Sequence, residues 1–251
     1  MVSGSNKNDI YFSRFLRSWM ITYNFKMIAD DAGATRFHVI LDERLHPRNS
    51  LISNEMNVWQ GPAILIYNDA KFTESDYKSL MQIRVGGKQD DAAMIGKHGL
   101  GFNSCYHFTN VPSFVSGDCV AFLDPQEKFL PTNSEGKPQR GIIGPIPKNG
   151  ICEYSGRDQL VPFEGIEGLD FRSTYEGTLF RIPLRREPSD ISDSIFTTGD
   201  ILNLITDIKS CITSQLLFLR NIETIETSRI LQDTAPCQKN ISLEGDHKGI
   251  G

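Results

Sequence analysis

The feature that most constrains this chain is a glycine-rich segment that reads G-K-H-G-L-G-F-N-S from Gly96 to Ser104. Three glycines at this spacing let backbone amides approach an anion closely, and a helix is predicted to begin just after them. Unpaired amides and the helix dipole together favour a phosphate group. A glycine-rich turn between packed elements is the plain structural alternative, and the segment alone does not choose between the two.

Two better-known phosphate motifs do not fit this segment. A dinucleotide fingerprint counted from Gly99 would need a glycine where Ser104 stands, and it should follow directly on a strand rather than on a long polar loop. A Walker-type loop needs Gly-Lys followed by Ser or Thr, whereas Gln89 follows the first Gly-Lys pair and His98 follows the second. The hypothesis of a dinucleotide-dependent oxidoreductase therefore rests on glycines alone.

Hydrophobic patterning predicts several strands. Residues 36–42 read R-F-H-V-I-L-D, which places Phe37, Val39 and Leu41 on one side of a strand. The continuous apolar run A-I-L-I-Y predicts a buried strand after Gly61 and Pro62. Further strands are predicted at 114–123, broken near Gly117, and at 178–184.

Helices and loops are predicted between these strands. Thr73, followed by Asp76, predicts the start of a short helix, and N-S-C-Y-H-F at 103–108 predicts the first turns of another. Residues 84–101 are predicted to form a mobile loop, and the residues at 125–175, rich in proline, glycine and charge, long surface connections. A longer amphipathic helix is predicted from apolar residues at helical spacing: Ile201, Leu204, Ile205, Ile208 and Ile212.

Composition narrows the class of protein. The 26 basic and 31 acidic residues give a net charge of −5, which offers no broad positive field to a nucleic-acid backbone, so no nucleic-acid partner is expected. The five cysteines are widely spaced without a C-x-x-C pair, which argues against a disulfide framework or a zinc site and for a reducing compartment. No apolar run reaches the roughly 18 residues of a membrane span. We expect no membrane association and a cytoplasmic protein, with the nucleus as the alternative.

Five motifs occur in a fixed order along the chain. They read A-D-D-A-G-A-T at 29–35, I-Y-N-D-A-K-F-T at 66–73, I-G-K-H-G-L-G-F-N-S-C-Y-H at 95–107, D-P-Q-E-K at 124–128 and E-G-T-L-F-R-I-P-L at 176–184. In this order they closely resemble the sacsin-type repeat domain. More distantly they are similar to the GHKL superfamily of gyrase, histidine kinase, mismatch-repair and heat-shock-chaperone ATPases. The resemblance implies a two-layer α/β sandwich, the Bergerat fold, in which helices back a mixed sheet and nucleotide lies under a glycine-rich lid.

The resemblance also implies which residues would bind ATP or ADP. Asp31 falls where the family places an acidic residue beside the nucleotide, linked through water or metal. Asn68 or Asp69 falls where a carboxylate accepts a hydrogen bond from the adenine amino group, and the motif does not choose between them. Thr178 would hydrogen-bond near the adenine, directly or through water. The residues assigned to the phosphate cradle are Gly96, Gly99, Leu100, Gly101 and Phe102.

Each of these assignments has a plain structural alternative. Asp31 could simply cap a turn, and Asn68 with Asp69 could form an ordinary turn after a buried strand. Thr178 is a β-forming residue at the start of a strand and could be structural. The ordered set of motifs supports the nucleotide site more strongly than any single member does.

The first motif departs from the family pattern at two functional positions. The pattern is E-x-x-x-N-A-D-D-A, whereas this chain reads N-F-K-M-I-A-D-D-A. Without a gap, Asn24 stands in place of the Glu and Ile28 in place of the Asn; if residues have been lost, K-M-I is the remnant of a longer run in which both groups are absent. The Glu is the expected general base for water, and an amide cannot accept that proton. The Asn completes the Mg²⁺ shell, and isoleucine offers this cation no oxygen. No catalytic residue or metal ligand is therefore assigned, and Mg²⁺ coordination is expected to be weakened or absent.

These features predict an ATP-binding domain of a sacsin-like chaperone or protein-quality-control protein. Nucleotide would order a lid over residues 84–98 and change contacts with neighbouring domains or client proteins, while hydrolysis would be slow. The alternative is a non-hydrolysing interaction module, a pseudo-ATPase. We expect the domain at 26–228, preceded by an atypical segment at 1–25 and followed at 229–251 by a disordered or truncated continuation.

Overall fold

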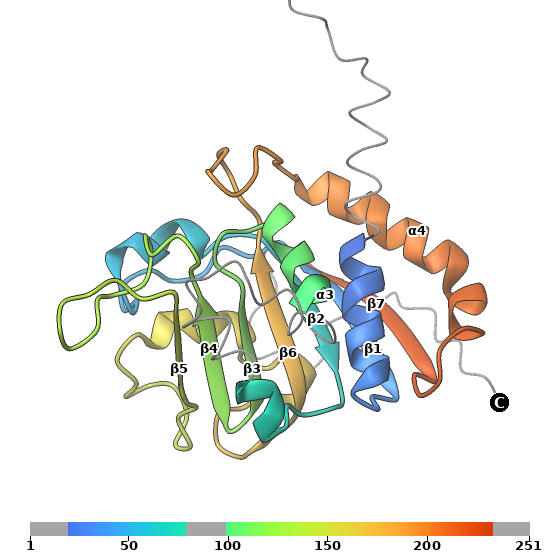
Figure 1. The fold of residues 1–251 in the computed structure, drawn as a ribbon, viewed down its shortest axis with the longest axis horizontal. Helices are drawn as coiled ribbons and strands as arrows, with labels where there is room; N and C mark the ends of the chain where they lie inside the picture. Colours follow the sequence, from blue (N-terminus) through green and yellow to red (C-terminus); the bar gives the residue numbers. More distant parts are fainter. Residues whose placement is uncertain (1–19, 79–98, 233–251) are drawn as a thin grey trace, which may run out of the picture.

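The computed structural model describes residues 20–78 and 99–232. A seven-stranded sheet of order β5-β4-β3-β6-β2-β1-β7 lies at its centre, and all neighbours are antiparallel except β1 and β7, which are parallel. Helices cover one face of this sheet (Figure 1). The predicted α/β sandwich with a mixed sheet is confirmed. The strands are β1 (Arg36–Asp42), β2 (Ala63–Asn68), β3 (Ser113–Gly117), β4 (Cys119–Leu123), β5 (Gly141–Pro145), β6 (Tyr175–Pro183) and β7 (Thr224–Ile230).

β1 forms where the sequence predicted it and shows how the sheet buries both of its faces. Phe37, Val39 and Leu41 belong to the core cluster under the helices, whereas Ile40 belongs to a second core cluster. Successive side chains of a strand point to opposite faces, so His38 lies on the side of Ile40. Because of this alternation, the polar side chain of His38 lies on the face of the second core cluster and not under the helices.

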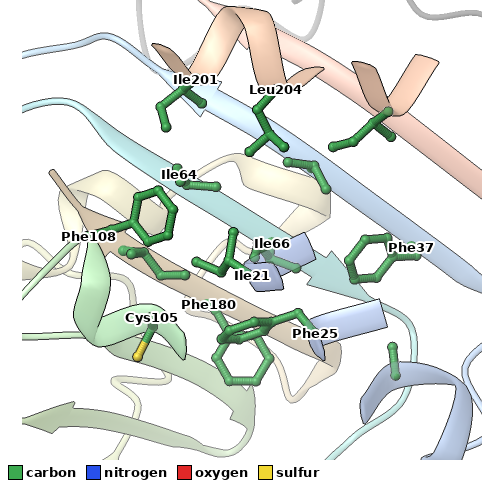
Figure 2. Close-up of a cluster of buried hydrophobic side chains, with 14 of the residues drawn as sticks. Ile21, Phe25, Phe37, Ile64, Ile66, Cys105, Phe108, Phe180, Ile201 and Leu204 are labelled. Atoms are coloured by element: carbon green, nitrogen blue, oxygen red, sulfur yellow. The ribbon is translucent and has the colours of Figure 1, made fainter. Parts of the chain in front are cut away.

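The helix of residues 20–31 covers part of the first face. Ile21, Phe25 and Ala29, one turn apart, are at most 1% exposed and pack against the sheet (Figure 2).

α4 (Thr198–Leu216) covers the same face where the periodicity predicted a helix. It begins with a capping box, in which the Asp200 amide donates to Thr197 Oγ1 (3.2 Å) and the Thr197 amide donates to Asp200 Oδ2 (2.7 Å). The short helix at 74–78 starts in the same way, because the Thr73 amide donates to Asp76 Oδ2 (2.7 Å). The predicted start at Thr73 is confirmed, and so is the predicted helix that contains Ile201 to Ile212.

α3 (Gly99–Asn103) begins inside the stretch that was predicted to be a loop, and it continues into the 3-10 helix η2 (Ser104–His107). Glycine disfavours a helix, but here Phe102 packs against the core and Cys105 is fully buried. Tertiary packing therefore outweighs local propensity. Residues 79–98, which include Gly96 and the whole predicted lid at 84–98, lie outside the described ranges.

On the second face of the sheet, the structure differs from the prediction that residues 125–175 form long surface connections. This stretch supplies the edge strand β5 and the 3-10 helices η3 (Arg157–Gln159), η4 (Val161–Phe163) and η5 (Ile166–Gly168). Leu160, Phe163 and Phe171 are fully buried there. Three-residue 3-10 helices have no readable period, and the left-handed backbone at Gly156 and Gly165 interrupts them, so sequence patterning missed this layer.

A buried ionic cluster lies at the end of β1. Asp42 is fully buried and accepts hydrogen bonds from Arg44 Nε (2.7 Å) and His46 Nε2 (3.0 Å). Burial raises the pKa of Asp42, but the bonds from His46 and Arg44 outweigh it and lower that pKa to about 2. Arg181 is fully buried nearby, and desolvation lowers its pKa to about 10, although the Asp42 charge works against this shift. One carboxylate thus compensates the two guanidinium groups of Arg44 and Arg181.

Four of the five cysteines lie within the described part of the chain. Cys105, Cys119, Cys152 and Cys211 are all free thiols, and Cys237 lies outside the described residues. Within 20–78 and 99–232, no helix is both long and apolar enough to cross a membrane.

Candidate functional site

The two aspartates at the end of the helix of residues 20–31 have different roles. Asp30 is buried, and its Oδ1 accepts hydrogen bonds from the amides of Arg220 (3.0 Å), Asn221 (2.7 Å) and Ile222 (3.0 Å). Burial raises the pKa of Asp30, but these amides outweigh it and lower the pKa. Asp31 is exposed to solvent. Asp30 therefore fastens the helix to the chain just before β7, and Asp31, the residue assigned to the nucleotide, is exposed.

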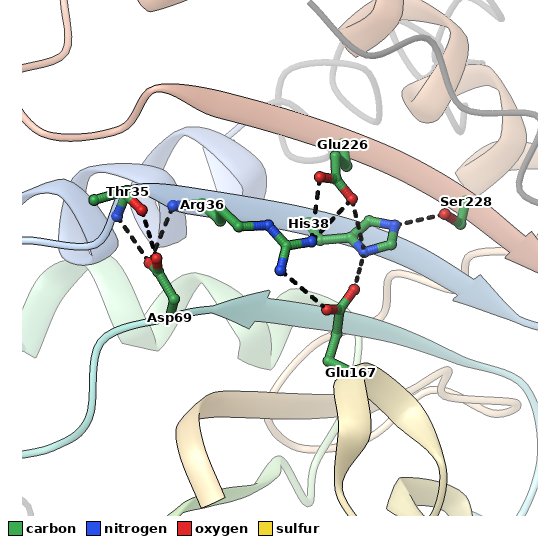
Figure 3. A network of polar contacts seen from close by, with 7 residues as sticks. All are labelled: Thr35, Arg36, His38, Asp69, Glu167, Glu226 and Ser228. Carbon is green, nitrogen blue, oxygen red and sulfur yellow. Dashed lines mark hydrogen bonds and ion pairs between the residues drawn. The ribbon is translucent and has the colours of Figure 1, made fainter. Parts of the chain in front are cut away.

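Asp69 joins the end of β2 to the start of β1. Its Oδ1 accepts hydrogen bonds from the amides of Thr35 (2.8 Å) and Arg36 (3.0 Å), and its Oδ2 accepts one from Thr35 Oγ1 (2.5 Å) (Figure 3). Burial raises its pKa, but these bonds outweigh burial and lower it. A carboxylate has about four acceptor positions, so three bonds leave roughly one on Oδ2.

Asn68 is more enclosed than its neighbour. It is 4% exposed, and its Oδ1 accepts a hydrogen bond from the Ala70 amide (3.1 Å), which forms the turn after β2. Asp69 is only half-buried. Of the two residues that the motif could not separate, Asp69 is the one with an accessible acceptor.

Thr178 lies on β6 opposite Asn68 and is 1% exposed. Its hydroxyl donates to the carbonyl oxygen of Ala70 (2.7 Å) and lies 2.7 Å from Ser116 Oγ. The same Ser116 hydroxyl accepts a hydrogen bond from the Phe72 amide (2.9 Å). Thr178 therefore holds the turn after β2 in place, and its own hydroxyl is engaged by the protein.

Gly101 faces the two positions at which the first motif departs from its family. A Cβ atom built on Gly101 would lie 3.1 Å from Ile28 Cδ1 and 3.6 Å from Asn24 Cβ. The helix of residues 20–31 and α3 thus approach closely at this glycine, and a larger residue there would have to displace Ile28. The side chains that face Gly101 from this helix are an amide and an alkyl group, neither of which is a general base.

Phe180 lies between the two groups of residues assigned to the site. Its ring centroid is 4.9 Å from that of Phe25, 6.1 Å from that of Phe102 and 6.1 Å from that of Phe72. Phe102 belongs to α3, and Phe72 follows the turn after β2. The glycines of α3 and the turn after β2 are therefore anchored to one aromatic cluster, and Phe102 is first of all a packing residue.

The second face of the sheet carries a polar cluster that the sequence analysis did not find. His38, Glu167 and Glu226 bring their side chains together there, beside Arg36 and Ser228 (Figure 3). Strand alternation alone places His38 on this face. The pairing of β1 with β7 and the path of η5 are needed to place the two glutamates.

Comparisons with known proteins identify relatives of this chain. A family model described as the sacsin domain matches residues 25–242. Human sacsin is 35% identical over 201 residues, which are 78% of this chain and 4% of that protein, so this chain spans a small part of its relative. Among solved structures, the N-terminal domain of a DNA repair protein aligns with a TM-score of 0.30 at 8% identity, covering 89% of this chain and 57% of that one. A score this low carries no argument about fold or function.

Proposed function

Because this chain belongs to the sacsin domain family, we propose that it is a nucleotide-binding domain that holds ATP or ADP and hydrolyses ATP slowly at most. The observation that carries the proposal is that the turn after β2 and α3 are both anchored to the aromatic cluster around Phe180. Asp69 keeps an acceptor position at the end of β2, and the glycines of α3 lie on the other side of the same aromatic cluster. Adenine would meet Asp69, and the phosphates would meet the backbone amides of Gly99 to Phe102.

Slow hydrolysis follows from the helix that faces Gly101. Asn24 cannot take a proton from water, and Ile28 offers Mg²⁺ no oxygen. Of the two aspartates of the motif, Asp31 is exposed to solvent and Asp30 is buried. We therefore expect nucleotide to bind with little help from Mg²⁺.

The proposal extends to the larger protein from which such a domain comes. Nucleotide would order the stretch 84–98, which lies outside the described residues, and would change contacts with neighbouring domains or client proteins. A role in chaperone or quality-control work in the cytoplasm, and membership of the GHKL superfamily, belong to the same proposal. They are supported by the five ordered motifs.

A non-hydrolysing interaction module is the second candidate, and specific contacts favour it. The hydroxyl of Thr178 and the amide of Asn68 are bonded within the protein, and Ile28 occupies the space beside Gly101. If the domain no longer binds nucleotide, these internal contacts would take the place of contacts to the nucleotide.

Calorimetric titration with ATP, ADP and NAD, each with and without Mg²⁺, separates the candidates. We expect ATP and ADP to bind, NAD not to bind, and Mg²⁺ to change the ATP affinity little, because the asparagine oxygen is missing. A phosphate-release assay should stay close to the rate without protein. Absence of binding by both ATP and ADP would leave the interaction module.

The variant Asp31→Asn makes the titration specific to the site. Asp31 is exposed, so its replacement should weaken ATP binding without changing the thermal midpoint. Asp193→Asn is the matched control, because Asp193 is also exposed and lies outside the five motifs. Equal ATP affinities of the two variants would show that Asp31 does not contribute to ATP binding.

A further inference from the structure

The polar cluster on the second face of the sheet contains three potential metal ligands from three separate elements. His38 comes from β1, Glu226 from β7 and Glu167 from η5, and their ligand atoms all lie within 4.8 Å of one another. β1 and β7 are paired so that His38 stands opposite Glu226. Residues far apart in the sequence thus converge on one point, which Figure 3 shows from close by.

The distances suit a tetrahedral zinc ion. Bonds of about 2.0–2.1 Å to zinc place neighbouring ligand atoms roughly 3.3–3.4 Å apart. His38 Nδ1 lies 2.5 Å from Glu167 Oε1 and 3.7 Å from Glu226 Oε2, values on either side of that spacing. Small side-chain rotations are enough to replace the hydrogen bond between His38 and Glu167 by two bonds to a metal.

The imidazole of His38 is held in the orientation that such a site needs. It is 2% exposed, and its Nε2 is hydrogen-bonded to Ser228 Oγ, which leaves Nδ1 facing the glutamates. When Nε2 carries the proton and donates to Ser228, Nδ1 has a free lone pair. Metal-binding histidines characteristically use the second ring nitrogen in this way.

In the metal-free protein, the Arg36 guanidinium supplies the positive charge beside Glu167 and Glu226. It lies 3.5 Å from Glu167 and 3.2 Å from Glu226, and 41% of the Arg36 side chain is exposed. This guanidinium places one positive charge beside the two carboxylates. A divalent cation would compensate the same two negative charges, and Arg36 can turn towards solvent.

A second observation points to a ligand at this place. The Tyr175 hydroxyl is buried and has no hydrogen-bond partner within the described part of the chain. Tyr175 and Glu167 line the same hollow of about 200 Å³, which opens to solvent. Buried hydroxyls normally find a partner, and a water on an open metal position would supply one.

We propose that His38, Glu167 and Glu226 bind a transition-metal dication, with Zn²⁺ as the expected ion and an open coordination position towards the hollow beside Tyr175. Imidazole with two carboxylates prefers zinc over Mg²⁺, which takes oxygen ligands and keeps its waters. The site lies on the face of the sheet opposite the helices. The inference does not rest on the proposed nucleotide site.

Zinc binding is tested by competition against a chromophoric chelator, with the whole chain, free of any tag and of nucleotide. The natural chain should take up one Zn²⁺, and His38→Gln and Glu226→Gln should each weaken binding at least tenfold. Ser228→Ala should weaken it about 10- to 100-fold, because this hydroxyl positions the imidazole. Arg36→Gln removes a competing cation and should bind as tightly as the natural chain or more tightly.

Two controls separate this site from other donors. Cys152→Ser removes an exposed thiol and should leave zinc affinity unchanged. Cobalt(II) bound to the natural chain should show no thiolate charge-transfer band, a readout that needs no variant to fold. The proposal would be overturned by no zinc uptake by the natural chain, by a zinc affinity of the His38→Gln or Glu226→Gln variant equal to that of the natural chain, or by a thiolate band.

Discussion

The double variant Asn24→Glu/Ile28→Asn should release phosphate from ATP about 10²- to 10⁴-fold faster than the natural chain, the range that a positioned general base contributes. Both residues face Gly101 from the same side of one helix, one turn apart. Glutamate would supply the proton acceptor, and asparagine an oxygen for Mg²⁺. Both positions are only partly buried, so the helix can accept polar side chains there.

The matched control for this gain of activity is Asn24→Gln/Ile28→Asn. Glutamine has the size of glutamate without its basicity, so this variant should bind MgATP better than the natural chain and still hydrolyse it slowly. Phosphate release measured with and without Mg²⁺ compares the two. Equal rates in both double variants would show that position 24 does not face the attacking water.

Replacing Asp42 should have the largest effect on stability. Asp42→Asn leaves Arg44 and the buried Arg181 without the carboxylate that compensates them, and breaking a buried ion pair from one side costs about 3–5 kcal/mol. That loss is a large part of the total stability of a domain. Urea unfolding followed by tryptophan fluorescence measures it. Asp190→Asn is the control, because Asp190 pairs with Lys128 at the surface, and that variant should unfold like the natural chain.

The pH dependence of unfolding gives a second view of the same cluster. The folded-state pKa of Asp42 is about 2 and its ordinary value is 3.8, so its stabilisation is complete above about pH 4 and is lost as the pH falls through 2. The difference amounts to roughly 2 kcal/mol. The pKa of His46 is also lowered, chiefly because burial disfavours its charged form. The unfolded chain therefore binds this proton more readily than the folded one, and the fold loses further stability as the pH falls below the ordinary His46 pKa of 6.5. Asp42→Asn should unfold with a smaller dependence on pH between 4 and 2, and an unchanged dependence would contradict this account.

Strands and helices with a clear period could be predicted from the sequence. The alternation in β1 and the helical spacing in α4 reflect one buried face each, and both elements formed where they were expected. The layer at 157–168 could not be predicted in the same way, because its 3-10 helices are three residues long. α3 was placed too late because glycine propensity was weighed without the packing of Phe102.

For the candidate site, the sequence could predict which positions of the chain belong to it, but not how their side chains are bonded. The motif order identified Asp31, Asn68, Asp69 and Thr178, but it could not show that Asp30 is bonded to the chain before β7 or that Thr178 is enclosed. Those contacts join residues more than a hundred positions apart. The cluster around His38 depends on the pairing of β1 with β7 and on the left-handed backbone of Glu167, which local patterns do not encode.

The central claim is that ATP lies between the turn after β2 and α3. Amide chemical-shift mapping of the isotope-labelled chain during an ATP titration tests it most directly. The account predicts saturable shifts at the amides of Asn68 to Lys71 and of Gly99 to Phe102, with little change at residues 167–176 on the second face. Unchanged amides in the first two segments at saturating ATP, or shifts confined to 167–176, would contradict the claim.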